Sequence, residues 1–145
     1  MSDKKSMRNK GIKVIFDTNI WISFLIGKRL SKIKNLLSDG RIIVVTTNQL
    51  FDEIKLVTSR DKLKKYFPKE SVNELIELLE TISEKIEITP THFVSRDPKD
   101  NFLLDLIDFS KADYLVTGDK DLLKHNPFGT AQILTPADFE RQIEK

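Results

Sequence analysis

The sequence of 145 residues contains no cysteine, only two histidines and only one tryptophan. Without cysteine, a disulfide framework and a thiolate metal site are both excluded. Two histidines also make a zinc site a poor interpretation. A bound metal would have to be held by carboxylates, whose oxygen atoms favour Mg²⁺ or Mn²⁺.

Long apolar runs and an excess of one charge are also missing. No apolar segment is long enough to span a membrane, and the basic residues 1–11 are not followed by the apolar core of a signal peptide. The net charge of +2 indicates no particular class of partner. We expect a cytoplasmic protein with no membrane partner, a flexible basic tail over residues 1–11 and one domain over residues 12–145.

Short apolar runs alternate along the chain with segments of helical periodicity. Strands are predicted at 12–16, 41–45, 113–118 and 131–135. Helices are predicted at 18–27, 30–40, 48–59, 70–88, 97–112, 119–124 and 136–144, with 84–89 able to form a short strand. Ser71 and Glu74 have the spacing of a capping box. Continuous apolar strands are typical of parallel sheets buried on both faces. The order predicts an α/β fold, a Rossmann-like three-layer sandwich around a central parallel sheet.

Acidic residues follow two of the predicted strands. Asp17 comes directly after the strand 12–16, and Asp119 and Asp121 come after the strand 113–118. Since the carboxyl ends of parallel strands meet at one edge of the sheet, and ligands bind there, these acids are candidates for a shared site.

Helix geometry adds two further acids. At about 100° per residue, Glu53 borders the apolar stripe of its helix, and Asp100 falls on the apolar side of the next acidic helix. Asp105 and Asp108 fall on the opposite side, where we expect solvent. Several carboxylates in one cleft would repel each other by several kcal/mol in a low dielectric, and a divalent cation would remove that repulsion.

Each acid also has a purely structural interpretation. Asp17 could simply cap the helix that follows it, and Asp119 or Asp121 could cap the short helix 119–124. Asp100 could pair with Asp97 in a capping box, and Glu53 could extend from a helix edge into water.

Four stretches of the chain resemble the acidic motifs of the PIN-domain nucleases. These are VIFDTNIWISFL, the helical Glu53, RDPKDNFLLDLI and DYLVTGDKDLL, and together the resemblance covers about residues 12–140. It is nearest to the bacterial branch that provides the toxins of type II toxin–antitoxin pairs. The resemblance implies a catalytic, metal-binding quartet of Asp17, Glu53, Asp100 and Asp119, with Asp121 as an outer ligand, Asn19 orienting Asp17 or a water, and Thr117 at the edge of the site.

The resemblance also implies an activity and partners. The activity is hydrolysis of RNA phosphodiester bonds with one or two Mg²⁺ or Mn²⁺ ions, which leaves 5′-phosphate and 3′-hydroxyl ends. The partners are an RNA substrate and an antitoxin protein. The oligomeric state stays open, with a homodimer among the candidates.

The segment 55–69 is rich in basic residues and carries two aromatic residues, Tyr66 and Phe67. Phosphate contacts combined with base stacking would suit single-stranded RNA. The candidate RNA-binding residues are Lys55, Arg60, Lys62, Lys64, Lys65 and Tyr66. The alternative is a solvated helix whose aromatic residues pack into the core.

Other enzyme classes lack their motifs. A haloacid-dehalogenase nucleophile would need a second aspartate at position 19, which is Asn19, and neither a P-loop nor a G-x-S-x-G elbow is present. The alternative from another class is a binding module that acts by pairing with an antitoxin, its acidic site being masked or weakly active.

Overall fold

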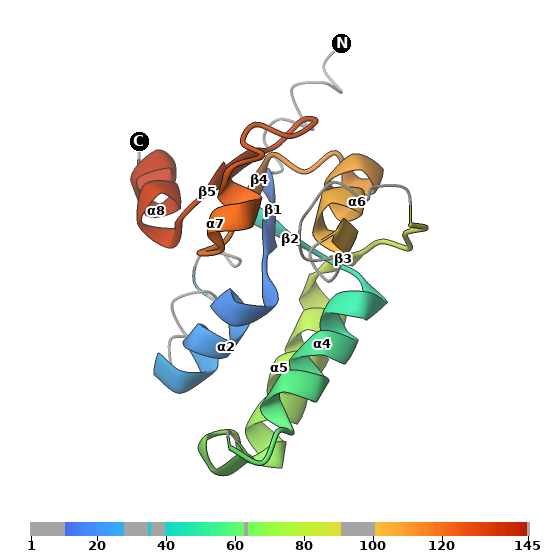
Figure 1. The fold of residues 1–145 in the computed structure, drawn as a ribbon, viewed down its shortest axis with the longest axis vertical. Coiled ribbons are helices and arrows are strands. Elements are labelled where there is room, and N and C mark those ends of the chain that lie inside the picture. The colour runs from blue at the N-terminus through green and yellow to red at the C-terminus, as the bar shows by residue number, and fades with distance from the viewer. Residues whose placement is uncertain (1–10, 28–34, 36–39, 63, 91–100, 145) are drawn as a thin grey trace.

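The computed structural model describes residues 11–27, 35, 40–62, 64–90 and 101–144. Within these residues, five parallel strands form one sheet in the order β3-β2-β1-β4-β5 (Figure 1). The strands are β1 (Ile12–Phe16), β2 (Ile42–Thr46), β3 (Glu84–Lys85), β4 (Tyr114–Val116) and β5 (Gln132–Leu134). The helices are α2 (Thr18–Gly27), α4 (Asn48–Thr58), the 3₁₀ turn η1 (Lys64–Tyr66), α5 (Lys69–Ile82), α6 (Asn101–Ser110), α7 (Lys120–Leu123) and α8 (Pro136–Glu144).

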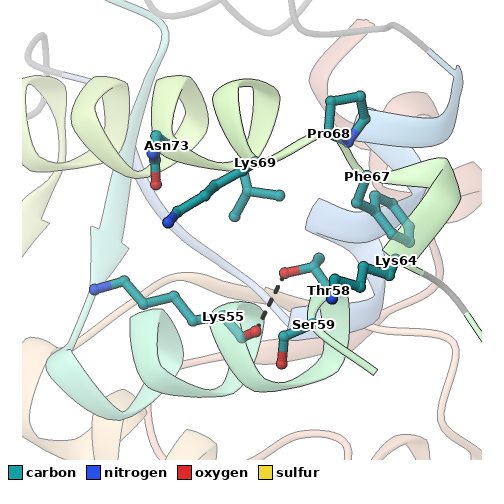
Figure 2. Close-up of a pocket in the computed structure, with 9 residues that line it drawn as sticks. Lys55, Thr58, Ser59, Lys64, Phe67, Pro68, Lys69 and Asn73 are labelled. Carbon is teal, nitrogen blue, oxygen red and sulfur yellow. Dashed lines mark hydrogen bonds between the residues drawn. The ribbon is translucent and has the colours of Figure 1, made fainter. Parts of the chain in front are cut away.

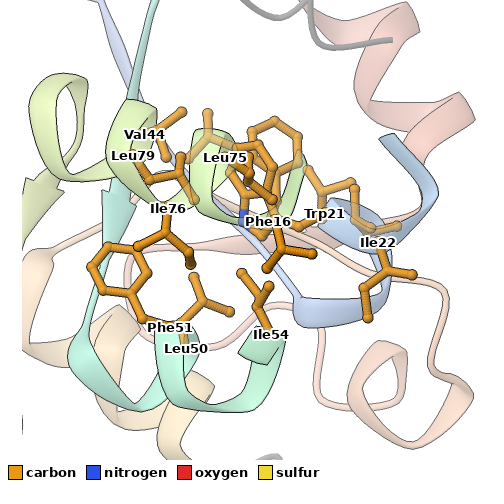
Figure 3. Packing of buried hydrophobic residues seen from close by; sticks show 14 of the residues in the cluster. Phe16, Trp21, Ile22, Val44, Leu50, Phe51, Ile54, Leu75, Ile76 and Leu79 are labelled. Carbon is orange, nitrogen blue, oxygen red and sulfur yellow. The ribbon is translucent and has the colours of Figure 1, made fainter. Parts of the chain in front are cut away.

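Helices cover both faces of the sheet, which confirms the predicted three-layer α/β sandwich. Successive side chains of a strand point to opposite faces, and in β1 Val14 and Phe16 join one core cluster whereas Ile15 joins the other. The first cluster brings α2, α4 and α5 against the sheet (Figure 3), and Phe139 of α8 belongs to it as well. The second cluster brings α6 and α7 against the opposite face.

Aromatic packing fixes the end of β1 against two helices. The Phe16 ring meets Trp21 of α2 edge-on at 5.2 Å between ring centroids, and it meets Phe139 of α8 at 5.8 Å. Such pairs contribute roughly 0.5–1.5 kcal/mol beyond the apolar area they bury. Because Asp17 follows Phe16 in the chain, this packing holds its backbone in place.

The longest predicted helix begins earlier and ends earlier than its sequence pattern indicates. α5 begins after Pro68, whose carbonyl accepts hydrogen bonds from the N–H groups of Ser71 and Val72. Ser71 is therefore inside the first turn, and the predicted Ser71–Glu74 capping box is wrong. After Ile82 the chain turns extended and pairs with β2, so the alternative of a short strand within 84–89 is confirmed.

Three other predicted features fall wholly or partly outside the described residues. These are the basic tail 1–11, apart from Gly11, the helix 30–40, apart from Asn35 and Gly40, and the start of the helix 97–112. The other predicted strands and helices are found within one or two residues of their expected ends. In the described part of the chain, no helix has the length and apolar character needed to cross a membrane.

α4 and α5 form a helical hairpin that extends away from the carboxyl edge of the sheet (Figure 1). The chain passes from one helix to the other through residues 59–68, at the end of the hairpin far from the sheet. α2 also contacts α4, so the two helices that follow β1 and β2 lie side by side. This arrangement places Asp17, which precedes α2, near Glu53 of α4.

Candidate active site

Asp17 caps a helix and also accepts a hydrogen bond from a neighbouring strand end. One carboxylate oxygen, Oδ1, accepts a hydrogen bond from the Ile20 N–H at 2.9 Å and so caps α2. The other oxygen, Oδ2, accepts a hydrogen bond from the hydroxyl of Thr117. Asp17 as a whole is nevertheless only 5% exposed. A simple surface cap would not need this burial.

The pKa of Asp17 is raised above its ordinary value, chiefly because burial removes water from the charged form. The hydrogen bonds from Thr117 and Ile20 act in the opposite direction, and the negative charges of Asp119 and Glu53 raise the pKa further. Three of the predicted quartet are therefore near enough for their charges to interact. This is the electrostatic setting that a cation would relieve.

Thr117 connects the ends of two neighbouring strands. It follows β4, which pairs with β1 so that Val116 lies beside Phe16, and its side chain is completely buried. Its hydroxyl donates to Asp17 and accepts a hydrogen bond from the Asp119 N–H at 3.0 Å. These contacts place Thr117 between Asp17 and Asp119, and its predicted position at the edge of an active site stays a prediction.

Asp119 is half-buried and caps α7, because its Oδ1 accepts a hydrogen bond from the Asp121 N–H at 2.7 Å. The capping interpretation of Asp119 is thus confirmed together with its nearness to Asp17. The carboxylate of Asp121 lies 4.0 Å from the ammonium group of Lys124. Its predicted role as an outer ligand stays a prediction.

Glu53 is half-buried and lines a cavity of about 480 Å³ between α2, α4 and the start of α6. We call this cavity the acid pocket. Its lining residues are Asn19, Gln49, Asp52, Glu53, Leu56, Val57, Arg60 and Phe102. Asn19 is exposed at the first turn of α2, as a residue that contacts a water or substrate would need to be.

Sequence reasoning missed several residues of the acid pocket. Gln49, Asp52 and Leu56 share one face of α4 with Glu53, because residues three, four and seven apart lie together on a helix. That spacing was a usable signal. Phe102 comes from a distant segment, and no local pattern links it to α4.

The two acids of α6 behave differently from expectation. Asp105 is only 2% exposed, so its predicted place on a solvent-facing side is wrong, and Asp108 is half-buried. The reason is that α6 is buried all round at this level: Leu103, Leu104, Leu106 and Ile107 are each at most 2% exposed. The side of α6 opposite its apolar stripe is therefore covered at Asp105, although Phe109 one turn later is 45% exposed.

The fourth predicted acid, Asp100, lies outside the described residues. Among the residues that are described, no three acidic or histidine side chains form a group that could hold a metal ion. The carboxylates of Asp17, Glu53 and Asp119 are near enough for the charges of Glu53 and Asp119 to act on Asp17, and carboxylate oxygens are ligands that suit Mg²⁺ or Mn²⁺. The residues present therefore fit such an ion in donor type.

The basic segment 55–69 is divided among three places. Arg60 lines the acid pocket. Lys62, Lys65 and Tyr66 are exposed, with the Lys65 ammonium 5.1 Å from the centroid of the Tyr66 ring, whereas Phe67 is 4% exposed and belongs to the core. Lys55, Lys64 and Lys69 line a second cavity (Figure 2). The alternative that the aromatic residues of this segment pack into the core is thus confirmed for Phe67 and wrong for Tyr66.

The comparisons with known proteins agree with this architecture. Residues 13–121 match the family model described as PIN domain. The chain is 34% identical to an uncharacterized protein of Methanocaldococcus jannaschii, and the alignment covers 97% of both chains. It is similar in fold to a chain of VapBC2 from Rickettsia felis, solved bound to a DNA fragment from their promoter. That match has a TM-score of 0.52 and 12% identity, and it covers 84% of this chain and 98% of the other. The chain therefore belongs to the PIN-domain family.

Proposed function

We propose that this protein is a metal-dependent endoribonuclease and the toxin of a toxin–antitoxin pair. The observation that carries the proposal is Asp17, a buried carboxylate with a raised pKa beside the charges of Asp119 and Glu53. Acids arranged in this way cost stability unless something positive binds among them. PIN domains are typically nucleases, and family membership directs this acidic site towards phosphodiester hydrolysis.

Asp17, Glu53 and Asp119, with Asp100, would hold the ion. A bound Mg²⁺ or Mn²⁺ supplies an acidified water and charge stabilisation at the phosphate. Thr117 keeps the Asp17 carboxylate in one orientation, because its hydroxyl occupies Oδ2 while the Ile20 N–H occupies Oδ1. Asn19, exposed at the edge of the acid pocket, is suited to contact the substrate or a water.

RNA would approach along the α4–α5 hairpin. Arg60 places a positive charge in the acid pocket, where it can contact a phosphate next to the one that is cleaved. Lys62, Lys65 and Tyr66 are exposed near the end of the hairpin, where cations and an aromatic ring suit a single strand. We propose an antitoxin protein as the second partner, because the similar fold of VapBC2 occurs in a toxin–antitoxin complex.

The test is incubation of the purified protein with single-stranded RNA in Mg²⁺, in Mn²⁺ and in EDTA. We expect cleavage with either metal, none in EDTA, and a loss of at least about 100-fold in Asp17→Asn, since a misplaced ion no longer activates water. Asp61→Asn is the matched control, because Asp61 is exposed and is not among the residues that line the acid pocket. RNA that stays intact with every metal would contradict the nuclease assignment and favour a binding module.

A further inference from the structure

The second cavity lies on a different side of α4 from the acid pocket. It also measures about 480 Å³, and it is lined by residues from the end of α4, from η1 and from the start of α5 (Figure 2). We call it the lysine pocket. Its lining residues are Lys55, Thr58, Ser59, Lys64, Phe67, Pro68, Lys69, Val72 and Asn73.

The charge of the lysine pocket is entirely positive. Three of its nine lining residues are lysines, and none is acidic. Lys55 and Lys69 extend from α4 and α5 towards the same side of the cavity, where Asn73 also lies, and Lys64 enters from the other side beside Thr58 (Figure 2). None of the ion pairs found among the described residues involves these three lysines. The like charges repel one another and together attract an anion.

The rest of the lining is mainly apolar or already hydrogen-bonded. Phe67 and Val72 are buried and form an apolar wall beside the lysines, with Pro68. The Thr58 hydroxyl donates to the Ile54 carbonyl at 2.7 Å, and the Ser59 hydroxyl donates to the Leu56 carbonyl at 2.9 Å. These two hydroxyls therefore offer a ligand only their acceptor sites. Donors for an anion must come from the three lysines and from Asn73.

We propose that the lysine pocket binds a segment of single-stranded RNA outside the site of cleavage. A nucleotide joins a phosphate, which suits Lys55 and Lys69, to a base, which can pack on the exposed Pro68 at the apolar wall of the pocket. This inference rests on the proposed function, which makes RNA the substrate, and it adds a second place where that RNA is held. Asn73 thereby becomes a contact that the basic segment did not indicate, and Lys69, the last residue of that segment, joins the candidate RNA-binding residues.

The two pockets share α4, and this sets the length of RNA that can occupy both. At about 100° per residue, Lys55 and Ser59 lie on a different side of the helix from Glu53 and Arg60. A helix with its side chains is about 10–12 Å across. At about 3.4 Å per phosphate in a stacked strand, the crossing takes roughly three to four nucleotides. Shorter RNA would reach one pocket only.

The experiment measures binding of a fluorescent 12-nucleotide single-stranded RNA by anisotropy, in EDTA and over a series of KCl concentrations. The test variant is Lys55→Gln with Lys69→Gln, which removes two charges and keeps the length of the side chains. The control is Lys85→Gln with Lys111→Gln, two exposed lysines elsewhere on the chain. Lys55→Arg with Lys69→Arg restores the charge and tests whether charge alone is responsible.

We expect the test pair to weaken binding and to reduce the salt slope by about 1.4, roughly 0.7 for each lost contact with a single strand. The control pair should leave the slope unchanged, and the arginine pair should restore it. Equal binding of the 12-mer by the test pair and the wild type would overturn the inference. Binding of an oligoglutamate peptide but not RNA would also overturn it, and would assign the pocket to an acidic protein.

Failure of the proposed nuclease function has a different signature. If the protein binds RNA through Lys55 and Lys69 but cleaves none in Mg²⁺ or Mn²⁺, the RNA-binding role of the lysine pocket is supported and the nuclease function is contradicted. If the wild type and the test pair cleave RNA with the same KM, the nuclease function is supported and the RNA-binding role of the lysine pocket is contradicted. In the expected case, KM rises for the 12-mer and kcat is unchanged.

Discussion

Replacing Thr117 with valine removes one hydroxyl from the centre of the site and leaves its shape almost intact. Thr117 is completely buried, and its hydroxyl donates to Asp17 and accepts from the Asp119 N–H. A hydrogen bond to a charged group contributes about 1.5–3 kcal/mol to stability. For a domain of this size, where 1 kcal/mol changes Tm by about 3–4 °C, the expected fall in Tm is roughly 5–12 °C.

The loss should depend on pH, and its sign follows from the ionisation of Asp17. Burial raises the pKa of Asp17, and the Thr117 hydrogen bond opposes that rise. Above the pKa of the folded protein the carboxylate is charged and misses its donor, so Thr117→Val should cost most there. Below it the carboxyl is neutral and the cost should shrink. Thermal melts in EDTA between pH 4 and about pH 8 measure this difference.

Thr117→Ser is the matched control, because serine keeps the hydroxyl and loses only a methyl group. It should show little of the pH-dependent loss. If the valine variant lost the same stability at every pH, or if serine behaved as valine does, the hydrogen bond to a charged Asp17 would not be the cause.

Three further outcomes are expected from the same structure. Glu53→Gln removes a charge that raises the pKa of Asp17, so the metal-free Tm above that pKa should hold or rise, measured by melts in EDTA. Gly11→Ala should destabilise the fold in urea titrations, because Gly11 has φ +99° and a Cβ there would clash with the Gly40 carbonyl. Phe139→Ala should cost about 3–5 kcal/mol in the same titrations, since it removes a buried ring from the aromatic packing on β1; a cost below about 1 kcal/mol would show that α8 contributes little.

The sheet and its covering helices could be predicted from the sequence because their signals are local. Continuous apolar runs gave β1, β2, β4 and β5 within one or two residues of their observed ends. Helical periodicity gave α4, and the residues Gly27 and Pro136 marked the end of α2 and the start of α8. The start of α5 could not be placed in the same way. Pro68 provides a carbonyl for the first turn without a capping side chain, and the Ser71–Glu74 pattern imitated a helix start two residues inside the real one.

That the acids Asp17 and Asp119 lie near each other could also be predicted, since Asp17 follows β1 directly and Asp119 follows β4 after Thr117 and Gly118. The sequence did not show that the Thr117 hydroxyl contacts both residues, donating to the Asp17 carboxylate and accepting from the Asp119 N–H. The contact with Asp17 depends on β1 and β4 being neighbours in the sheet. Asp105 shows the limit of reading one helix alone. Its angle on the helix wheel was opposite the apolar stripe, but α6 is enclosed on that side as well. The surroundings of a helix are set by the whole fold and not by its own periodicity.

The measurement that tests the shared acidic site most directly is thermal unfolding of the wild type and Asp17→Asn, each with and without Mn²⁺. The metal-free variant should melt at or above the wild-type Tm. Burying the charged Asp17 carboxylate costs free energy on folding, and the neutral asparagine amide avoids this cost and still caps α2. Mn²⁺ should raise the wild-type Tm and should raise the Tm of the variant much less, since stabilisation by a ligand follows its affinity for the folded state. An equal rise in both proteins would leave Asp17 as a helix cap and contradict the metal site.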